Sequence, residues 1–173
     1  MQEESPQVTI YTDGACSPNP GKGGYGIILI EDGQKREISG GFLNTTNNRM
    51  ELLSIIEALH ALKNHGSNVL VFSDSRYVVD AYSSKNAHRW QRQNWMRTKR
   101  DAAKNPDLWS RLLEVCQNHS VQMQWVAGHA GHQENERCDE LAVAARMRDD
   151  LPEDTGYLKP FTPPDMTQTL FDL

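Results

Sequence analysis

Two short runs of apolar and β-branched residues that each lead into an aspartate constrain the fold of this 173-residue chain more than any other feature. Residues 8–11 precede Asp13, and residues 69–72 precede Asp74. Such runs predict buried strands, so each aspartate should lie just past the carboxyl end of a strand. Open α/β sheets bind their ligands at that edge. The sequence therefore predicts an α/β domain with acidic side chains at its ligand-binding edge.

Two further acids, Glu51 in TTNNRMEL and Asp139 in GHQENERCDELA, occur in helix-like contexts. Carboxylates brought together repel one another and resist desolvation, so they are tolerated where a cation joins them. No thiolate cluster and few histidines accompany these acids, which favours a hard cation such as Mg²⁺ or Mn²⁺. The competing interpretation is that each acid, taken alone, is a helix cap or a solvated surface group.

Hydrophobic periodicity predicts the element order βββαβααβα. Short loops join strands at residues 8–12, 25–30 and 35–42, which predicts an antiparallel meander, and the Gly/Pro-rich residues 16–24 read as a loop. The later elements are a helix at 50–62, capped at residues 46–48, that carries Glu51 in its first turn, a strand at 69–72, helices at 75–82 and 106–116, a strand at 121–126 and a helix at 134–147. The first strand is expected to pair in parallel with the later ones.

The distribution of charge predicts a polyanionic partner, although the net charge of the chain is −5. Residues 85–104 contain seven lysines and arginines and one aspartate, so this segment alone carries +6. A basic island on an acidic protein is a localised electrostatic footprint.

Cysteine usage and the ends of the chain predict a cytoplasmic protein. Cys16, Cys116 and Cys138 are odd in number and widely spaced, which favours free thiols in a reducing compartment. The polar residues 1–6 lack a secretion signal, and no apolar stretch is long enough to span a bilayer, so we expect no membrane partner. From residue 149 to 173, four prolines and scattered acids predict a flexible tail.

Five segments occur in order over residues 7–148: TDGACSPNPGKGGYG, TTNNRMEL, SDSRYV, NPDLW and WVAGHAGHQENERCDELA. Together they resemble type 1 ribonuclease H of the bacterial kind. The resemblance implies a ribonuclease H-like catalytic domain at 7–148, with a five-stranded mixed sheet flanked by helices. It also implies Mg²⁺-dependent, sequence-nonspecific endonuclease cleavage of the RNA strand of RNA/DNA hybrids. The implied metal-binding acids are Asp13, Glu51, Asp74 and Asp139, with His129 on a mobile loop.

The chemistry of phosphodiester hydrolysis accounts for this residue set. Two Mg²⁺ ions, with Mn²⁺ as a substitute, activate water and stabilise the leaving oxygen, which yields 5′-phosphate and 3′-hydroxyl ends. Asp13 is the candidate to bridge both ions, and His129 is suited to proton transfer near neutral pH. The rival interpretation groups His129, His132 and Cys138 as a zinc site, although no fourth ligand has suitable spacing.

The substrate-binding candidates come from the same motifs. Asparagine amides beside the acids suit hydrogen bonds to 2′-hydroxyls and minor-groove edges, although asparagine is also common in loops and caps. Arg76 is a departure, because relatives usually carry glutamine there; it either grips a phosphate or faces solvent. Thr46 is expected to contact a DNA phosphate. The full set of amide and small polar candidates is Cys16, Asn19, Thr46, Asn47, Asn48 and Asn135.

The basic segment resembles the protrusion by which the family straddles the DNA strand. Its tryptophans, Trp90 and Trp95, either form a platform for deoxyriboses or anchor the segment to the core, and both functions are compatible. Its cations would attract phosphates in a salt-sensitive way. The cationic candidates are Arg89, Arg92, Arg97, Lys99 and Arg100.

Two other functions remain alternatives: a DNA-cleaving nuclease of the same fold, and a non-catalytic hybrid-binding module. The module would predict a broken carboxylate set, whereas this set is complete. The compact chain with one basic protrusion favours a monomer. At the end of the tail, Gln168, Leu170 and Phe171 loosely resemble peptides that dock replication proteins on sliding clamps; the alternative is an unpartnered or self-docked tail.

Overall fold

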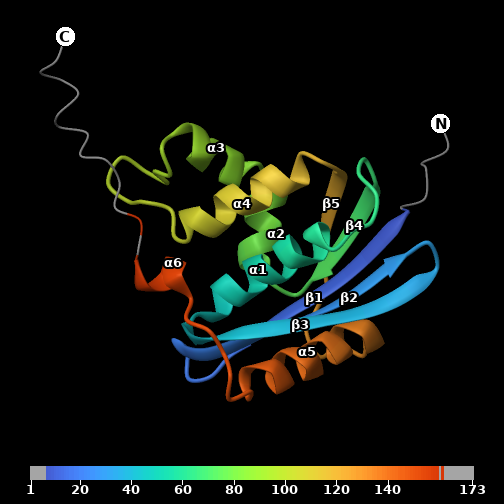
Figure 1. The fold of residues 1–173 in the computed structure, drawn as a ribbon. Helices are drawn as coiled ribbons and strands as arrows, with labels where there is room; N and C mark the ends of the chain where they lie inside the picture. Colours follow the sequence, from blue (N-terminus) through green and yellow to red (C-terminus); the bar gives the residue numbers. More distant parts are fainter. Residues whose placement is uncertain (1–6, 160, 162–173) are drawn as a thin grey trace, which may run out of the picture.

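The computed structural model describes residues 7–159 and 161, and one five-stranded mixed sheet organises them (Figure 1). The strand order is β3-β2-β1-β4-β5. Neighbours β1–β2 and β2–β3 are antiparallel, whereas β1–β4 and β4–β5 are parallel. The expected α/β class and the mixed sheet are therefore confirmed. The strands are β1 (Val8–Cys16), β2 (Gly21–Glu31), β3 (Gln34–Thr45), β4 (Asn68–Ser73) and β5 (Ser120–Trp125).

Helices cover both faces of the sheet (Figure 1). They are α1 (Asn47–His60), α2 (Arg76–Ser83), α3 (Asn86–Arg92), α4 (Pro106–Cys116), α5 (Gln133–Arg146) and α6 (Thr155–Leu158). Helix α1 packs on β1 and β2 with α4 against its outer side, while α5 packs on the opposite face over β1, β2 and β3. No helix within residues 7–159 has both the length and the apolar character of a membrane span.

The main hydrophobic core lies between the sheet and α1 and extends to α4. Because α1 is covered by the sheet on one side and by α4 on the other, ten of its residues are buried. Burial of a large aliphatic side chain contributes about 1.5–3 kcal/mol, so this layer holds the first turns of α1 firmly against β1. Its largest fully buried side chains include Ile10, Ile27, Leu29, Leu52, Ile55, Ile56, Trp109 and Leu112.

The first two strands are longer than expected, because glycines that predict a loop lie inside β2 instead. Only residues 17–20 connect β1 to β2, in place of the expected loop at 16–24. A Cβ atom at Gly24 or Gly26 would collide with the backbone of α5 at Ala142 or Cys138. These glycines therefore permit a close strand-to-helix approach, a tertiary function that composition alone does not distinguish from a turn.

Helix α1 begins within the cap region that the sequence predicts at residues 46–48. Thr46 caps it, with its hydroxyl accepting a hydrogen bond from the Arg49 backbone N–H at 3.3 Å. Glu51 therefore lies in the second turn of the helix, and its placement in the first turn was wrong. Two short helices, α3 and α6, are absent from the predicted order, because neither has a periodic apolar pattern long enough to reveal it.

Residues 149–159 differ from the expected flexible tail, because they pack on the domain. Leu151 is buried, and the Leu43 backbone N–H donates to the Pro152 carbonyl at 2.9 Å. Asp154 accepts a 2.6 Å hydrogen bond from Arg49, a residue 105 positions away that no local pattern links to it. The proposed clamp-binding residues Gln168, Leu170 and Phe171 lie outside the described part of the chain.

Candidate active site

Three acids from different elements meet at one edge of the sheet. Asp13 lies near the end of β1, Asp74 directly follows β4, and Glu51 comes from α1. Because β1 and β4 are parallel neighbours, their carboxyl ends share an edge, as the sequence predicts. One carboxylate oxygen from each acid lies within 4.8 Å of the other two. Within residues 7–159 and 161, this is the one such group of three or more metal-ligating side chains.

Hydrogen bonds from a single backbone group orient two of these carboxylates. The Gly14 N–H donates to Asp13 Oδ1 at 2.8 Å and to Glu51 Oε1 at 3.1 Å. A Cβ atom at Gly14 would lie 2.9 Å from the Glu51 backbone nitrogen, so glycine is needed where α1 approaches β1. Glu51 is buried, and its second oxygen, Oε2, has no hydrogen-bond partner.

The electrostatics of the cluster disfavour three free carboxylates. Burial, followed by repulsion from Asp74, raises the pKa of Asp13 from 3.8 to about 7. Burial and the charges of Asp13 and Asp74 raise the pKa of Glu51 well above its ordinary value. The pKa of Asp74 is also raised, again chiefly by burial, although nearby His129 opposes the shift. A cation at this position would remove the repulsion.

The donor set fits a hard divalent cation. Mg²⁺ and Mn²⁺ prefer carboxylate oxygens, and the cluster offers three such groups within ligand distance of one another. The buried Glu51 Oε2 is an acceptor with no donor among the residues that the structure describes, as expected of an atom that binds a cation. The geometry and the chemistry of the acidic cluster thus fit a metal site.

Asp139 and His129 line the same cavity of about 360 Å³ as the three clustered acids. Asp139 belongs to α5, whereas His129 lies in the exposed loop before it, with a positive φ of 55°. The loop passes close to the cluster, because a Cβ atom at Gly128 would lie 2.6 Å from Asp74 Oδ2. The five residues expected to form the catalytic set therefore meet at one site.

The alternative zinc group is not assembled. Cys138 is fully buried, and its thiol donates to the Tyr11 carbonyl at 3.2 Å. Burial raises the pKa of Cys138 to about 12, so this thiol is poorly suited to bind metal as a thiolate.

Three predicted substrate-binding residues, Asn47, Asn48 and Arg76, also line the cavity of the acids. The Arg76 guanidinium lies 3.7 Å from the centre of the Trp125 ring, and Trp125 Nε1 donates to the Asp74 carbonyl at 2.9 Å. The exposed Arg76 also approaches Asp80 at 3.7 Å. Arg76 is therefore solvent-exposed while it stacks on Trp125, and among the described residues its ion pair is with Asp80 and not with the clustered acids.

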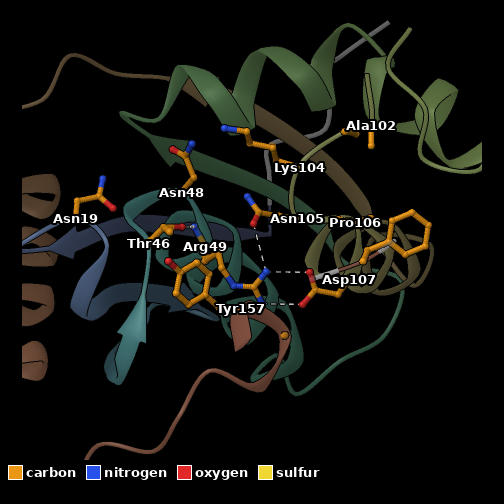
Figure 2. A pocket seen from close by; sticks show the side chains of 13 residues that line it. Asn19, Thr46, Asn48, Arg49, Ala102, Lys104, Asn105, Pro106, Asp107 and Tyr157 are labelled. Carbon is orange, nitrogen blue, oxygen red and sulfur yellow. Dashed lines mark hydrogen bonds and ion pairs between the residues drawn. The ribbon is translucent and has the colours of Figure 1, made fainter. Parts of the chain in front are cut away.

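A second cavity of about 730 Å³ lies beside the first and shares Asn48 with it (Figure 2). Asn19 and Thr46 line it on one side, and Lys104 lies across from them. Asn19 Oδ1 accepts a hydrogen bond from the Asn47 N–H at 3.2 Å, which joins the loop after β1 to the start of α1. Amides, a hydroxyl and a cation around one groove suit a phosphate-containing ligand.

Cys16 and Asn135 contribute less directly to these cavities. The Cys16 thiol is half-buried and lies within hydrogen-bond distance of the Thr45 carbonyl at 3.5 Å, so it supports the strand ends that carry Thr46. Asn135 is 2 % exposed, and its Oδ1 has no hydrogen-bond partner. Sequence reasoning placed both at the substrate, whereas the structure places Asn135 inside the protein.

The basic segment combines exposed cations with tryptophans that are largely packed inside. Trp90 is 9 % exposed and packs edge-on against Trp109 at 5.9 Å, while Trp95 is partly buried against the core. The anchoring role therefore accounts for most of the Trp90 surface. A third cavity of about 320 Å³, lined by Trp90, Arg97 and Arg100 among others, lies at this segment. The predicted cations Arg89, Arg92, Arg97, Lys99 and Arg100 are all exposed.

Several residues at the two grooves were not singled out from the sequence. Tyr77 lines the acidic cavity, and Arg49, Asn105 and Tyr157 line the second cavity. Arg49 and Asn105 fall inside the motifs TTNNRMEL and NPDLW, so their position was a usable signal. Tyr157 had no such signal in the sequence, because it lies in the predicted tail after the last predicted helix.

Known proteins share both the sequence and the fold. The RNase H family model matches residues 5–147. A Ribonuclease H of Trichodesmium erythraeum (strain IMS101) is 52 % identical over 157 residues, which cover 91 % of this chain and 99 % of that protein. A Ribonuclease H of Desulforamulus reducens is 54 % identical over 148 residues, which cover 86 % of this chain and 92 % of that protein. The crystal structure of LC9-RNase H1, a type 1 RNase H with the type 2 active-site motif, matches with a TM-score of 0.72 and 29 % identity over 97 % of this chain and 92 % of that one. The chain belongs to the RNase H family.

Proposed function

We propose that this protein is a sequence-nonspecific endonuclease that hydrolyses the RNA strand of RNA/DNA hybrids and leaves 5′-phosphate and 3′-hydroxyl ends. The observation that carries the proposal is the cluster of Asp13, Glu51 and Asp74 oxygens within 4.8 Å, with Asp139 and His129 on the same cavity. The RNase H family is metal-dependent, and relatives named Ribonuclease H share about half of this sequence.

The four carboxylates of Asp13, Glu51, Asp74 and Asp139 are the proposed holders of two Mg²⁺ ions, with Mn²⁺ as a substitute. When bound, these ions supply the Lewis acidity that activates water and stabilises the leaving 3′-oxygen. Asp13 has the central place among the acids, because it lies on the middle strand and the Gly14 N–H fixes its Oδ1.

The remaining groups bind the substrate and transfer a proton. His129 lies on an exposed loop beside Asp74, where its imidazole accepts a proton from the attacking water or donates one to the departing oxygen. Asn47 and Asn48 face the same cavity and suit the 2′-hydroxyls that distinguish RNA from DNA. Asn19 and Thr46 in the second groove suit phosphates of the DNA strand.

The exposed cations of the basic segment extend this surface beyond the grooves. They lie on and after α3, and their charge attracts the backbone of a hybrid without reading its sequence. We further propose a cytoplasmic monomer, with residues 7–148 as the catalytic domain. A DNA-cleaving nuclease of this fold is the main alternative, and the paired asparagines next to the acids favour RNA instead.

The test is Asp13→Asn compared with the control Asp32→Asn, which removes the same charge from an exposed turn. Asp13→Asn should abolish nearly all hybrid cleavage, while binding of hybrid measured without divalent metal is retained. Asp32→Asn should retain both, since asparagine tolerates the positive φ of 52° at that turn. Wild-type turnover in Asp13→Asn would rule out the proposed metal site.

A further inference from the structure

A segment that follows the match to the RNase H family model, which ends at residue 147, forms one wall of the second groove. We name residues 151–158 the C-terminal strap. Leu151 is buried, and Pro152 accepts a backbone hydrogen bond from Leu43 in β3. Tyr157 in α6 lines the groove and lies near Thr46 and Arg49 (Figure 2). The strap is thus a docked part of the domain that shapes the proposed substrate surface.

Asp154 is the residue that ties the strap to the groove. It is 6 % exposed, and its Oδ2 accepts hydrogen bonds from Arg49 Nε at 2.6 Å and from the Thr45 hydroxyl at 2.7 Å. Its Oδ1 accepts from Arg49 Nη2 at 3.0 Å, and the side chain also caps α6 through the Tyr157 N–H. Both carboxylate oxygens are therefore used.

Arg49, in α1, connects the groove to the start of α4 and to the C-terminal strap, because each nitrogen of its guanidinium donates a hydrogen bond. It is 2 % exposed and donates to Asp107 at the start of α4 at 2.7 and 2.9 Å, in addition to its bonds with Asp154. It also donates to the Asn105 side chain at 3.3 Å. Figure 2 shows the Arg49 guanidinium between Asn105 and Asp107, with Tyr157 beside it. We call the guanidinium with its bonds to Asn105, Asp107 and Asp154 the Arg49 fork. Paired guanidinium–carboxylate contacts of this kind fix orientation as well as energy.

Arg49 lies in the first turn of α1, next to the residues that face the groove. Thr46 caps the helix by accepting from the Arg49 N–H, and Asn48 precedes Arg49 directly. A shift of the Arg49 main chain, which its anchored guanidinium resists, would move the hydroxyl and amide that face the groove, while Glu51 is held separately by the Gly14 N–H. Loss of Asp154 should disturb the groove more than the acid cluster.

We propose that Asp154 is a positioning residue for hybrid binding: through Arg49 it sets the place of Thr46, Asn48 and Asn105 against the phosphates of the uncleaved strand. The inference rests on the proposed function. It gives the strap a part in substrate binding, whereas a merely stabilising ion pair would affect unfolding alone.

The negative charge of Asp154 and its positioning of Arg49 should change hybrid affinity in opposite directions, which makes the proposal testable. Removing a negative charge beside a phosphate groove would by itself tighten binding. Losing the position of Arg49 would weaken it. Asp154→Asn combines both effects, whereas Glu153→Gln removes one charge from the adjacent, exposed residue, whose side chain bonds to Asn44. Glu153→Gln is therefore the matched control.

A second variant disturbs the Arg49 fork without changing any charge. A Cβ atom at Gly156 would lie 2.5 Å from Arg49 Nη2 and would also collide with the Asp107 carboxylate. Gly156→Ala should therefore displace the same guanidinium from the outside. Gly156→Ala therefore tests the same position of Arg49 if Asp154→Asn is too unstable to assay.

The experiment compares KM and kcat on a short RNA/DNA hybrid, together with hybrid affinity without divalent metal. Asp154→Asn and Gly156→Ala should raise KM and the metal-free Kd about 10-fold, with kcat within about 2-fold of wild type. Glu153→Gln should leave all three within about 2-fold. Uncharged methylphosphonate linkages in the DNA strand should reduce the difference between variant and wild type, because the misplaced groups no longer have a phosphate to bind.

Each other result would overturn the proposal. A lower melting temperature with unchanged KM would make Asp154 merely stabilising. A lower KM would make its charge the dominant effect. A fall in kcat at unchanged KM would place the strap's influence on the acid cluster. If wild-type protein binds hybrid but does not cleave it, the proposed function fails, and the metal-free affinities still decide the role of Asp154.

Discussion

Trp125 Nε1 donates a 2.9 Å hydrogen bond to the main-chain carbonyl of Asp74. Trp125 is the last residue of β5, and Asp74 directly follows the neighbouring parallel strand β4. The indole thus fixes the backbone of a proposed metal-binding acid from outside the cavity, while Arg76 stacks on its ring. This bond links the end of β5 to the acid cluster.

Replacing Trp125 with Phe should lower kcat about 5-fold and change KM by less than 2-fold, because one hydrogen bond of about 1 kcal/mol no longer positions Asp74. A phenyl ring can still stack under Arg76, so hybrid affinity should persist. Steady-state kinetics at saturating Mg²⁺ provide the measurement. Unchanged kcat would show that Asp74 is positioned adequately without the indole.

Arg76→Gln tests the residue that departs from the family pattern. If the stacked guanidinium binds a phosphate, the slope of log Kd against log salt should fall by about one in this variant. Arg76→Lys retains the charge and should retain the slope, although it loses the planar stack on Trp125. The slope is read from hybrid affinity at several salt concentrations. Equal slopes for all three proteins would mean that Arg76 contacts no phosphate.

Asp13→Asn should stabilise the metal-free protein at high pH. The pKa of Asp13 is raised from 3.8 to about 7 in the folded protein, so its protonated form contributes stability that is full below about pH 4 and is lost as the pH rises through 7. Asparagine avoids that loss, which is on the order of 4 kcal/mol.

Thermal unfolding in a metal chelator measures this effect. At pH 8 the variant should melt about 10 °C above the wild type, and the difference should shrink toward zero at pH 4. Added Mg²⁺ should raise the melting temperature of the wild type more than that of the variant. A pH-independent difference would contradict the raised pKa of Asp13.

Neutralising the basic segment should weaken binding without slowing chemistry. Changing Arg89, Arg92, Arg97 and Arg100 to glutamine should raise KM, and it should reduce the salt slope by about 3 if each contacts one phosphate. The exposed pair of Arg97 with Asp101, at 4.0 Å, contributes little to stability.

A charge-matched control changes Lys35, Lys63, Arg111 and Arg137, which line none of the three cavities. This control should retain the salt slope of the wild type. A collapse of kcat in the first variant at saturating hybrid would instead make the basic segment part of the catalytic assembly.

The sheet and the meeting of the acids were predictable, because both depend on local signals. Apolar runs before Asp13 and Asp74 indicate strand ends, and parallel pairing of β1 with β4 then places these ends together. A loop was wrongly predicted at the glycines of β2, because these glycines permit the close approach of α5, which local sequence does not show. Helix α6 was missed because its N-cap, Asp154, depends on a distant arginine.

The substrate surface was predictable in part. Asn48 and Thr46 lie in motifs beside the acids, and both face a groove. The sequence could not decide whether Trp90 binds sugar or anchors the segment, since an amphipathic ring suits both; packing against Trp109 accounts for most of its surface. Asn135 was expected at the substrate because it neighbours Asp139 in sequence, yet the helix turns its side chain inward.

The most direct test of the central claim is cleavage of one sequence presented as RNA/DNA hybrid, double-stranded RNA, single-stranded RNA and double-stranded DNA. Each substrate is uniformly labelled and assayed with Mg²⁺ and with a chelator. The carboxylate cluster and the asparagines beside it predict cuts at many positions in the RNA of the hybrid alone, with 5′-phosphate and 3′-hydroxyl ends, and none in chelator. Preferential cleavage of any other substrate, or cleavage that persists in chelator, would contradict the account.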